Sequence, residues 1–120
     1  MVQEPALECT FFIPTHRDAN LSDGQLHEQR VWNWLHDELF VRFEGATTAP
    51  GLYEGYYKDP DTNQQVADKS YKLIVAVPQS QTDDLRSLLS ASCVMFQQKC
   101  IYLSVAGQVE FIEAPKDDSS

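Results

Sequence analysis

The sequence has few positive charges and no long hydrophobic segment, and each shortage excludes a class of protein. Nine Lys and Arg residues stand against 18 Asp and Glu in 120 residues, which gives a net charge of −9. Because nucleic-acid-binding domains present a basic surface to the phosphates, we expect no nucleic-acid partner. No apolar run reaches the roughly 20 residues that span a bilayer. The segment 1–5 also lacks the basic start and apolar core of a signal peptide, so we expect a cytoplasmic protein without membrane contact.

Cysteine and histidine are scarce, and their spacing predicts neither disulfides nor a metal site. Cys9, Cys93 and Cys100 cannot all pair within one chain and form no C-x-x-C motif, so we expect reduced, buried thiols. The three histidines are not spaced as metal ligands on one helix turn, and no Cys-His spacing matches a zinc site. We therefore predict no metal and no other cofactor.

One acidic segment imitates the beginning of a calcium-binding loop. Asp59, Asp61 and Asn63 have the spacing of the first three ligands of such a loop. The later positions that need glycine and glutamate hold Gln64 and Ser70 instead. Because Asp, Pro and Asn favour turns without any metal, we interpret the segment as a hairpin turn.

The hydrophobic pattern predicts strands and helices in alternating order. Apolar residues at every second position indicate strands, and an apolar stripe of helical period indicates helices. The expected strands cover residues 6–14, 52–58, 70–77 and 100–105, with 109–112 as an extension or a short edge strand. The expected helices run from Ser22 or Asp23 to about Phe43, and from Thr82 to Phe96.

This order favours the α+β class and, within it, a ferredoxin-like α/β plait (β-α-β-β-α-β). Each helix follows a strand and returns the chain to the sheet, as in split β-α-β units with right-handed crossovers. We expect an antiparallel sheet of 4–5 strands in the order 4-1-3-2, with two helices on one face. A single ferredoxin-like domain would cover residues 6–113, with flexible tails at 1–5 and 114–120.

A plait leaves one sheet face without helices, and this sequence makes that face hard to keep polar. Phe12, Ile74, Tyr57 and Tyr102 are candidates for it. An apolar open face suggests a partner, a ligand pocket or a covering loop, and the segment 44–51 is long enough to provide the cover. Because isologous dimers are the commonest oligomers, we expect a homodimer or a protein partner.

The sequence supports two functional hypotheses, which belong to different classes of protein. No hydrolase or nucleotide-binding signature is present, so the first is a non-enzymatic domain that self-associates or binds a protein. The alternative is a small-molecule-binding protein or small enzyme with a pocket at the open sheet face, since function concentrates in loops and pockets. No catalytic residue is assigned; the ligand-binding residues of the alternative would be His16, Tyr53, Tyr57, Ser70 and Tyr71.

Several short motifs together resemble a bacterial family of small domains of unknown function. The resemblance covers about residues 9–105 and rests on the segments 9–12, 41–43, 51–52, 55–58 and 70–75, with Trp34. This chain has Tyr57 where the family tends to have tryptophan, and the polar segment 15–18 in place of a glycine-rich loop. The resemblance implies a ferredoxin-like layout and no established activity.

Overall fold

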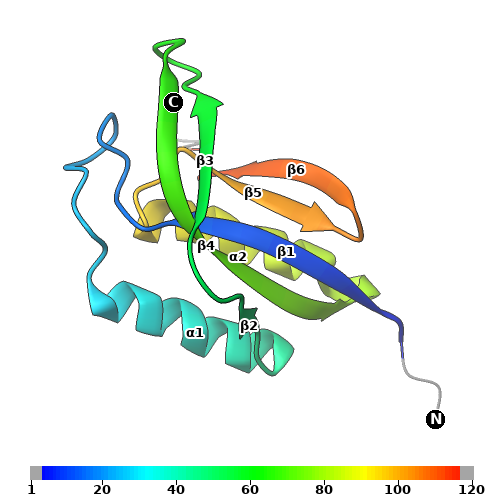
Figure 1. Cartoon of the computed structure of the whole chain (residues 1–120). Coiled ribbons are helices and arrows are strands. Elements are labelled where there is room, and N and C mark those ends of the chain that lie inside the picture. The colour runs from blue at the N-terminus through cyan, green and yellow to red at the C-terminus, as the bar shows by residue number, and fades with distance from the viewer. Residues whose placement is uncertain (1–3, 117–120) are drawn as a thin grey trace.

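A computed structural model describes residues 4–116 and shows two α-helices and a six-stranded antiparallel sheet (Figure 1). The predicted α+β class is confirmed. The elements are β1 (Ala6–Pro14), α1 (Gln29–Phe43), β2 (Thr47–Thr48), β3 (Tyr53–Lys58), β4 (Gln65–Pro78), the short 3₁₀ helix η1 (Gln79–Gln81), α2 (Thr82–Met95), β5 (Cys100–Val105) and β6 (Gln108–Glu113).

β1 and β4 form the centre of the sheet. They pair along the whole of β1, from Ala6 opposite Pro78 to Pro14 opposite Ser70. β5 pairs with the other edge of β1, and β6 then pairs with β5, so the spatial order is β2-β4-β1-β5-β6. β3 also pairs with β4, on a stretch beyond the one that β2 occupies. The short β2, which was not predicted, has only two residues and therefore leaves no alternating pattern in the sequence.

The hydrophobic core lies between one face of the sheet and both helices. Alternate residues of β1, β4 and β5 point into it, and each helix contributes the apolar stripe that its period predicts. The core includes Cys9, Phe11, Ile13, Leu73, Val75, Val77, Ile101 and Leu103 of the sheet, with Val31, Leu35, Leu39, Leu85, Leu88 and Leu89 of the helices.

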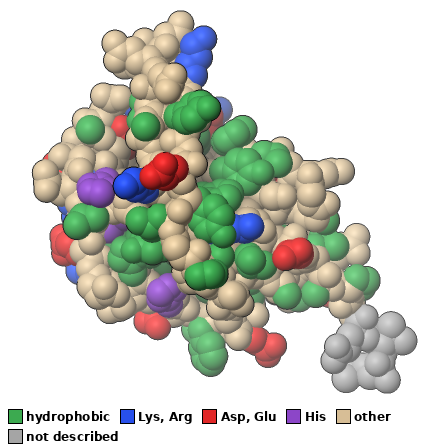
Figure 2. All heavy atoms as spheres, viewed as in Figure 1, with side chains coloured by type: hydrophobic (Ala, Val, Ile, Leu, Met, Phe, Trp, Pro, Cys, Tyr) green, Lys and Arg blue, Asp and Glu red, His purple; other side chains and the backbone are tan. Residues whose placement is uncertain are grey.

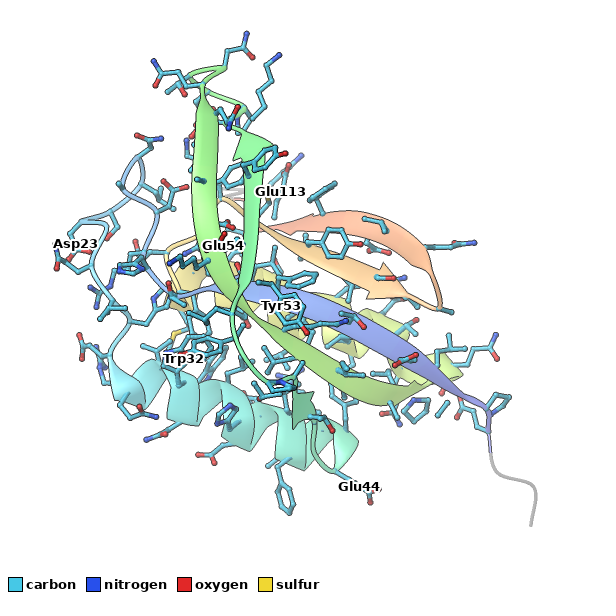
Figure 3. The ribbon with its side chains drawn as sticks, viewed as in Figure 1. Asp23, Trp32, Glu44, Tyr53, Glu54 and Glu113 are labelled. Atoms are coloured by element: carbon cyan, nitrogen blue, oxygen red, sulfur yellow. The ribbon has the colours of Figure 1, made fainter. Side chains whose placement is uncertain are left out.

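The opposite sheet face carries a row of aromatic side chains. Phe12 contacts Tyr102 edge-to-face at 5.3 Å between ring centroids and Tyr53 at 5.8 Å, and Tyr102 contacts Phe111 at 5.9 Å. Hydrophobic side chains gather over this part of the molecule in Figure 2, and Figure 3 places Tyr53 in front of β1. The segment 44–51 does not cover this face, because its strand β2 lies in the plane of the sheet beside β4.

Helix α1 begins at Gln29, several residues later than the predicted Ser22 or Asp23. The Asp23 side chain accepts a hydrogen bond from the Gln25 backbone N–H at 3.0 Å, which closes a turn rather than a helix. Gly24 has a φ of +70°, a left-handed conformation that a right-handed helix cannot contain. The residues expected in the first helical turns therefore belong to a loop.

β4 begins at Gln65 rather than Ser70, which lengthens the hairpin with β3 (Figure 1). We call residues 53–70 the β3–β4 arm. At its tip the Asp59 N–H donates to the Gln64 carbonyl at 2.9 Å, and the Asn63 N–H donates to the Asp59 carbonyl at 2.8 Å. These bonds agree with the predicted turn. Between residues 4 and 116 no group of acidic, His and Cys side chains is arranged to hold a metal ion.

Both ends of the described chain contact the domain. The Pro5 carbonyl accepts a hydrogen bond from the Gln79 N–H at 3.0 Å, and Ala114 packs against the core. The rest of the predicted tails, residues 1–3 and 117–120, lies outside the described residues. Within 4–116, neither helix has the length and apolarity to cross a bilayer.

Candidate functional site

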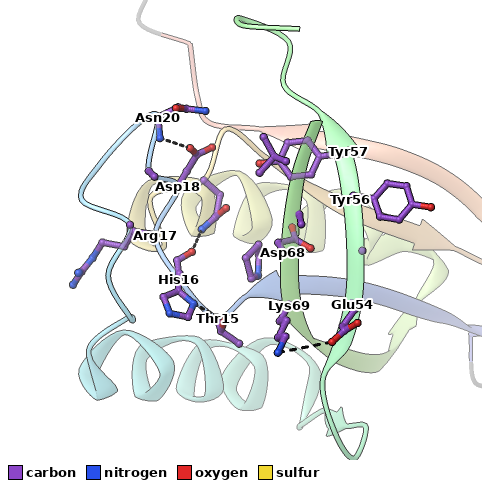
Figure 4. A pocket seen from close by; sticks show the side chains of 17 residues that line it. Thr15, His16, Arg17, Asp18, Asn20, Glu54, Tyr56, Tyr57, Asp68 and Lys69 are labelled. Carbon is purple, nitrogen blue, oxygen red and sulfur yellow. Dashed lines mark hydrogen bonds and ion pairs between the residues drawn. The ribbon is translucent and has the colours of Figure 1, made fainter. Parts of the chain in front are cut away.

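A cavity of about 740 Å³ lies between the loop 15–24 and the β3–β4 arm (Figure 4). This volume falls within the range of about 300–1,000 Å³ that small-molecule sites occupy. The cavity exists because β4 continues past the end of β1, and the loop that follows β1 faces the projecting arm. Its lining comprises residues 14–20, Gly24, residues 54–57, residues 66–69 and Gln98.

Backbone hydrogen bonds hold the loop wall of the cavity in place. The Arg17 N–H donates to the Gln25 carbonyl at 2.8 Å, and the Asp18 N–H donates to the Gln97 carbonyl at 3.0 Å. The Gln98 side chain, which is buried, donates to the His16 carbonyl at 2.8 Å. The loop is thus tied both to itself and to the segment between α2 and β5, so its side chains face the cavity from a fixed backbone.

Asp18 presents a carboxylate whose two oxygens differ. Its Oδ1 accepts a hydrogen bond from the Asn20 N–H at 2.7 Å. Its Oδ2 is shielded from solvent and has no hydrogen-bond partner among residues 4–116. A buried acceptor without a partner costs about 1–3 kcal/mol, and more when it is charged. A ligand that brings a positive charge or an N–H group to this oxygen would remove that cost.

Tyr57 of β3 faces Asp18 across the cavity (Figure 4). Burial raises the pKa of Tyr57 to about 12, and the negative charges of Asp18 and Asp68 add to the shift. The phenol therefore stays protonated at neutral pH and can donate its O–H to a ligand.

Asp68 of β4 is the second carboxylate of the cavity without an ion-pair partner among the described residues. It lies directly opposite Gly55 in the β3–β4 register, so no side chain of β3 covers it there. Burial raises the pKa of Asp68. A carboxylate in this situation is a stronger base than an exposed one.

The cationic side chains that line the cavity are paired with carboxylates other than Asp18 and Asp68. The Arg17 guanidinium lies 3.2 Å from the Asp23 carboxylate and 3.5 Å from that of Glu28. The Lys69 ammonium lies 3.8 Å from the Glu54 carboxylate. Asp18 and Asp68 consequently leave the cavity with a negative potential, which favours a cationic ligand.

The structure separates the ligand-binding residues that the sequence predicted. His16 and Tyr57 line the cavity, but Tyr53 lies in the aromatic row of the open face. Ser70 is buried between Pro14 and Tyr53 in the sheet. Tyr71 instead lines a smaller cavity of about 210 Å³ beside α1, where it contacts Trp32.

Sequence reasoning missed Asp18 and Asp68 as site residues. Asp18 was noticed only as part of a polar loop, and Asp68 lies in a stretch that was not recognised as strand. Burial alternates along residues 65–70 in the structure, but their side chains show no alternation of apolar and polar types in the sequence, so no local signal indicated that β4 extends this far.

Two solved structures of a phage SAM lyase are similar to this chain. The first, in complex with S-methyl-5′-thioadenosine, has a TM-score of 0.64 at 15% identity and covers 95% of this chain and 94% of that one. The second, in the apo state, has a TM-score of 0.65 at 14% identity and covers 98% and 97%. At these identities the likeness shows a shared fold. No protein-family model matches this sequence, and no curated protein matches it.

These structures correct the leading functional expectation. A non-enzymatic domain that self-associates or binds a protein was favoured because no catalytic signature was found. The two solved structures just described share this fold over nearly their whole length; they are structures of an enzyme, and one holds a small molecule. The alternative, a small-molecule-binding protein or small enzyme, agrees better with these findings and with the cavity.

Proposed function

We propose that this chain is an enzyme that binds a sulfonium nucleoside of the S-adenosylmethionine type and cleaves a carbon–sulfur bond. Two independent observations support the proposal. The fold is shared with a phage SAM lyase, and the cavity presents unpaired carboxylates to a ligand. The observation that carries the proposal is Asp18 Oδ2, a shielded oxygen that lacks a partner among the described residues.

The chemistry of the substrate matches the charge of the cavity. S-adenosylmethionine carries a permanent positive charge on sulfur, whereas its thioether product is neutral. Carboxylates in a partly desolvated site attract such a cation more strongly than carboxylates in water, because the effective dielectric constant is lower. Asp18 and Asp68 hold the cation in this proposal, and the Tyr57 hydroxyl donates a hydrogen bond that orients the ligand.

The bond cleavage makes modest demands on the protein. In an elimination, a base removes a proton from the carbon next to the one bonded to sulfur, and the electrons of that C–H bond form a carbon–carbon double bond. The electron pair of the carbon–sulfur bond passes to sulfur, which leaves as a neutral thioether such as S-methyl-5′-thioadenosine. A neutral leaving group needs no general acid, so the useful groups are those that position the cation and one that accepts a proton. Asp68, whose pKa burial raises, is our candidate for the proton acceptor.

The finer description of the fold belongs to the same proposal. We take the sheet to be a ferredoxin-like plait with additions. The segments β1–α1–β3 and β4–α2–β5 have the order of split β-α-β units, and β2 and β6 extend the sheet at its edges.

Binding and turnover test the proposed function directly. We expect isothermal titration calorimetry to detect S-adenosylmethionine binding to the purified chain, and chromatography to detect S-methyl-5′-thioadenosine after incubation. Asp18→Asn, which removes the charge at nearly constant volume, should weaken binding at least about tenfold. Asp37→Asn removes the same charge from an exposed site on α1 and is the matched control. Failure of the wild-type chain to bind or cleave S-adenosylmethionine would show that the proposal is wrong.

A further inference from the structure

Asp59 is a fully buried carboxylate outside the cavity. Its side chain is 0% exposed and lies under the turn at the tip of the β3–β4 arm. Both of its oxygens lie 3.1 Å from the Lys99 ammonium, and Oδ1 also accepts the N–H groups of Asp61 at 2.8 Å and Thr62 at 3.2 Å. A buried charge with this many donors has one strongly preferred position.

Asn20 connects this carboxylate to the cavity. Its side-chain amide donates to Asp59 Oδ2 at 3.0 Å across 39 residues of sequence. Its backbone N–H donates to Asp18 Oδ1 at 2.7 Å, the bond drawn in Figure 4. A continuous series of hydrogen bonds therefore runs from Lys99 through Asp59 and Asn20 to Asp18.

The direction of these bonds determines which oxygen of Asp18 is left for a ligand. The Asn20 N–H occupies Oδ1, so Oδ2 keeps its unused lone pairs. The Asp18 carbonyl in turn accepts the N–H groups of Leu21 at 3.1 Å and Ser22 at 2.7 Å, which fixes the backbone on the other side of Asn20. Among residues 4–116, the hydrogen bond from the Asn20 side chain to Asp59 is the one that joins this turn to the arm.

We propose that Asp59 is a positioning residue for the ligand site: through Asn20 it holds the Asp18 carboxylate with Oδ2 free to bind the positive charge of the ligand. The inference rests on the proposed function for the nature of the ligand. The inference adds that the preference of the site for a cationic over a neutral ligand depends on a residue outside the cavity. Without Asp59 the turn 18–22 loses its tie to the arm, and the Asp18 carboxylate samples orientations that bind the cation less well.

Asp59→Asn and Asn20→Ala are the test variants. Asp59→Asn replaces one acceptor oxygen with an NH₂ group. This NH₂ group must face either the Asn20 side-chain amide or the Lys99 ammonium, both of which are donors, so one of these hydrogen bonds is lost. Asn20→Ala removes the connection but leaves the Asp59–Lys99 pair intact, so it serves if Asp59→Asn does not fold. Asp61→Asn is the matched control, because Asp61 pairs with Lys99 at 2.7 Å but makes no hydrogen bond to Asn20 among the described residues.

The first measurement is independent of the ligand. Hydrogen exchange followed by NMR should show the Asn20 amide exchanging about tenfold faster in Asp59→Asn than in the wild type, with no change in Asp61→Asn. An unchanged Asn20 exchange rate in Asp59→Asn would overturn the inference, whatever the chain binds.

The second measurement is the ratio of the dissociation constants for S-methyl-5′-thioadenosine and S-adenosylmethionine. A structural defect weakens both ligands, whereas a misplaced Asp18 weakens the cation selectively. We expect Asp59→Asn and Asn20→Ala to lower this preference for the cation about tenfold, as Asp18→Asn does, and Asp61→Asn to leave it unchanged.

If Asp18→Asn loses the preference for the cation while Asp59→Asn and Asn20→Ala keep it, the inference is overturned. The proposed function then still stands. If instead the wild type binds neither ligand while the Asn20 amide still responds to Asp59→Asn, the proposed function fails. The connection from Asp59 to Asp18 then stands.

Discussion

The Lys99 ammonium lies 3.1 Å from both oxygens of the Asp59 carboxylate and joins two segments that are 40 residues apart in the sequence. Asp59 is fully buried, whereas the Lys99 side chain is 17% exposed. The pair fastens the tip of the β3–β4 arm to the connection between α2 and β5. It therefore fixes the spacing of the walls that enclose the cavity.

We predict that this pair stabilises the fold in a pH-dependent way. Its hydrogen bonds, led by the one from the Asp61 N–H, lower the pKa of Asp59 to about 2. Because the folded-state pKa is below the unfolded value near 3.8, the stabilisation is complete above pH 4 and is lost as the pH falls toward 2.

Asp59→Asn should lower the thermal midpoint by roughly 5 °C at pH 7, because the Lys99 charge loses a partner. The difference from the wild type should shrink between pH 4 and pH 2, as measured by circular dichroism. A difference that stays constant over this range would contradict the prediction.

We predict that Tyr57 ionises at a higher pH than an ordinary tyrosine. Its pKa is raised to about 12, chiefly by burial and then by the charge of Asp18. NMR of a chain labelled at the tyrosine Cζ carbons should show one resonance that titrates well above pH 10 and that is absent in Tyr57→Phe. Asp18→Asn should lower the pKa of this resonance. An unchanged titration in Asp18→Asn would place the two groups farther apart than the structure does.

We predict that Asp68 controls the acid side of the pH profile for turnover. Burial raises the pKa of its carboxyl above the ordinary value of 3.8, so the ionised base is lost at a higher pH than for an exposed aspartate. Asp68→Asn should lower turnover of S-adenosylmethionine on the order of 100-fold or more, as for the loss of a general base. It should also abolish the acid limb of kcat/KM. Near wild-type turnover in Asp68→Asn would show that a group other than Asp68 accepts the proton.

Most of the fold could be predicted because its elements have regular hydrophobic periods. The stripe of Val31, Leu35 and Leu39 predicted α1, and the alternation of Leu73, Val75 and Val77 predicted the central strand β4. The start of α1 was wrong, because Asp23 and Ser22 have the same preference for turns as for helix N-termini. The hydrogen bond from the Gln25 N–H to Asp23 and the left-handed φ of Gly24 distinguish the turn from a helix, and both depend on the surrounding structure.

The candidate site could be predicted only in part, because it depends on long-range register. Tyr53, Tyr57 and Tyr71 were predicted to bind one ligand, but strand alternation sends Tyr53 and Tyr71 to different faces of the sheet. The cavity forms where the stretch 65–69 pairs with β3 opposite the loop that follows Pro14 at the end of β1. No local pattern reports that Asp18 and Asp68 meet at one cavity, since their proximity requires the whole β1–β4 register.

The last prediction concerns His27, which is buried between Trp32 and Phe96. Its Nε2–H donates to the Pro14 carbonyl at 2.8 Å, and its buried Nδ1 has no partner among residues 4–116. Burial lowers the pKa of the ring, and the positive charge of Arg17 adds to the effect. Protonation would place a charge where no described group accepts the second N–H.

His27 should therefore make the fold less stable as the pH falls. The folded-state pKa is below the ordinary value of 6.5, so the unfolded chain binds the proton first and the free energy of unfolding decreases below about pH 6.5. Urea unfolding between pH 7 and pH 5 should show a smaller decrease for His27→Gln, whose amide can still donate to Pro14. His36→Gln, at an exposed position on α1, is the control and should keep the wild-type slope. Equal slopes for the wild type and His27→Gln would show that the imidazole accepts its proton without cost in the folded chain.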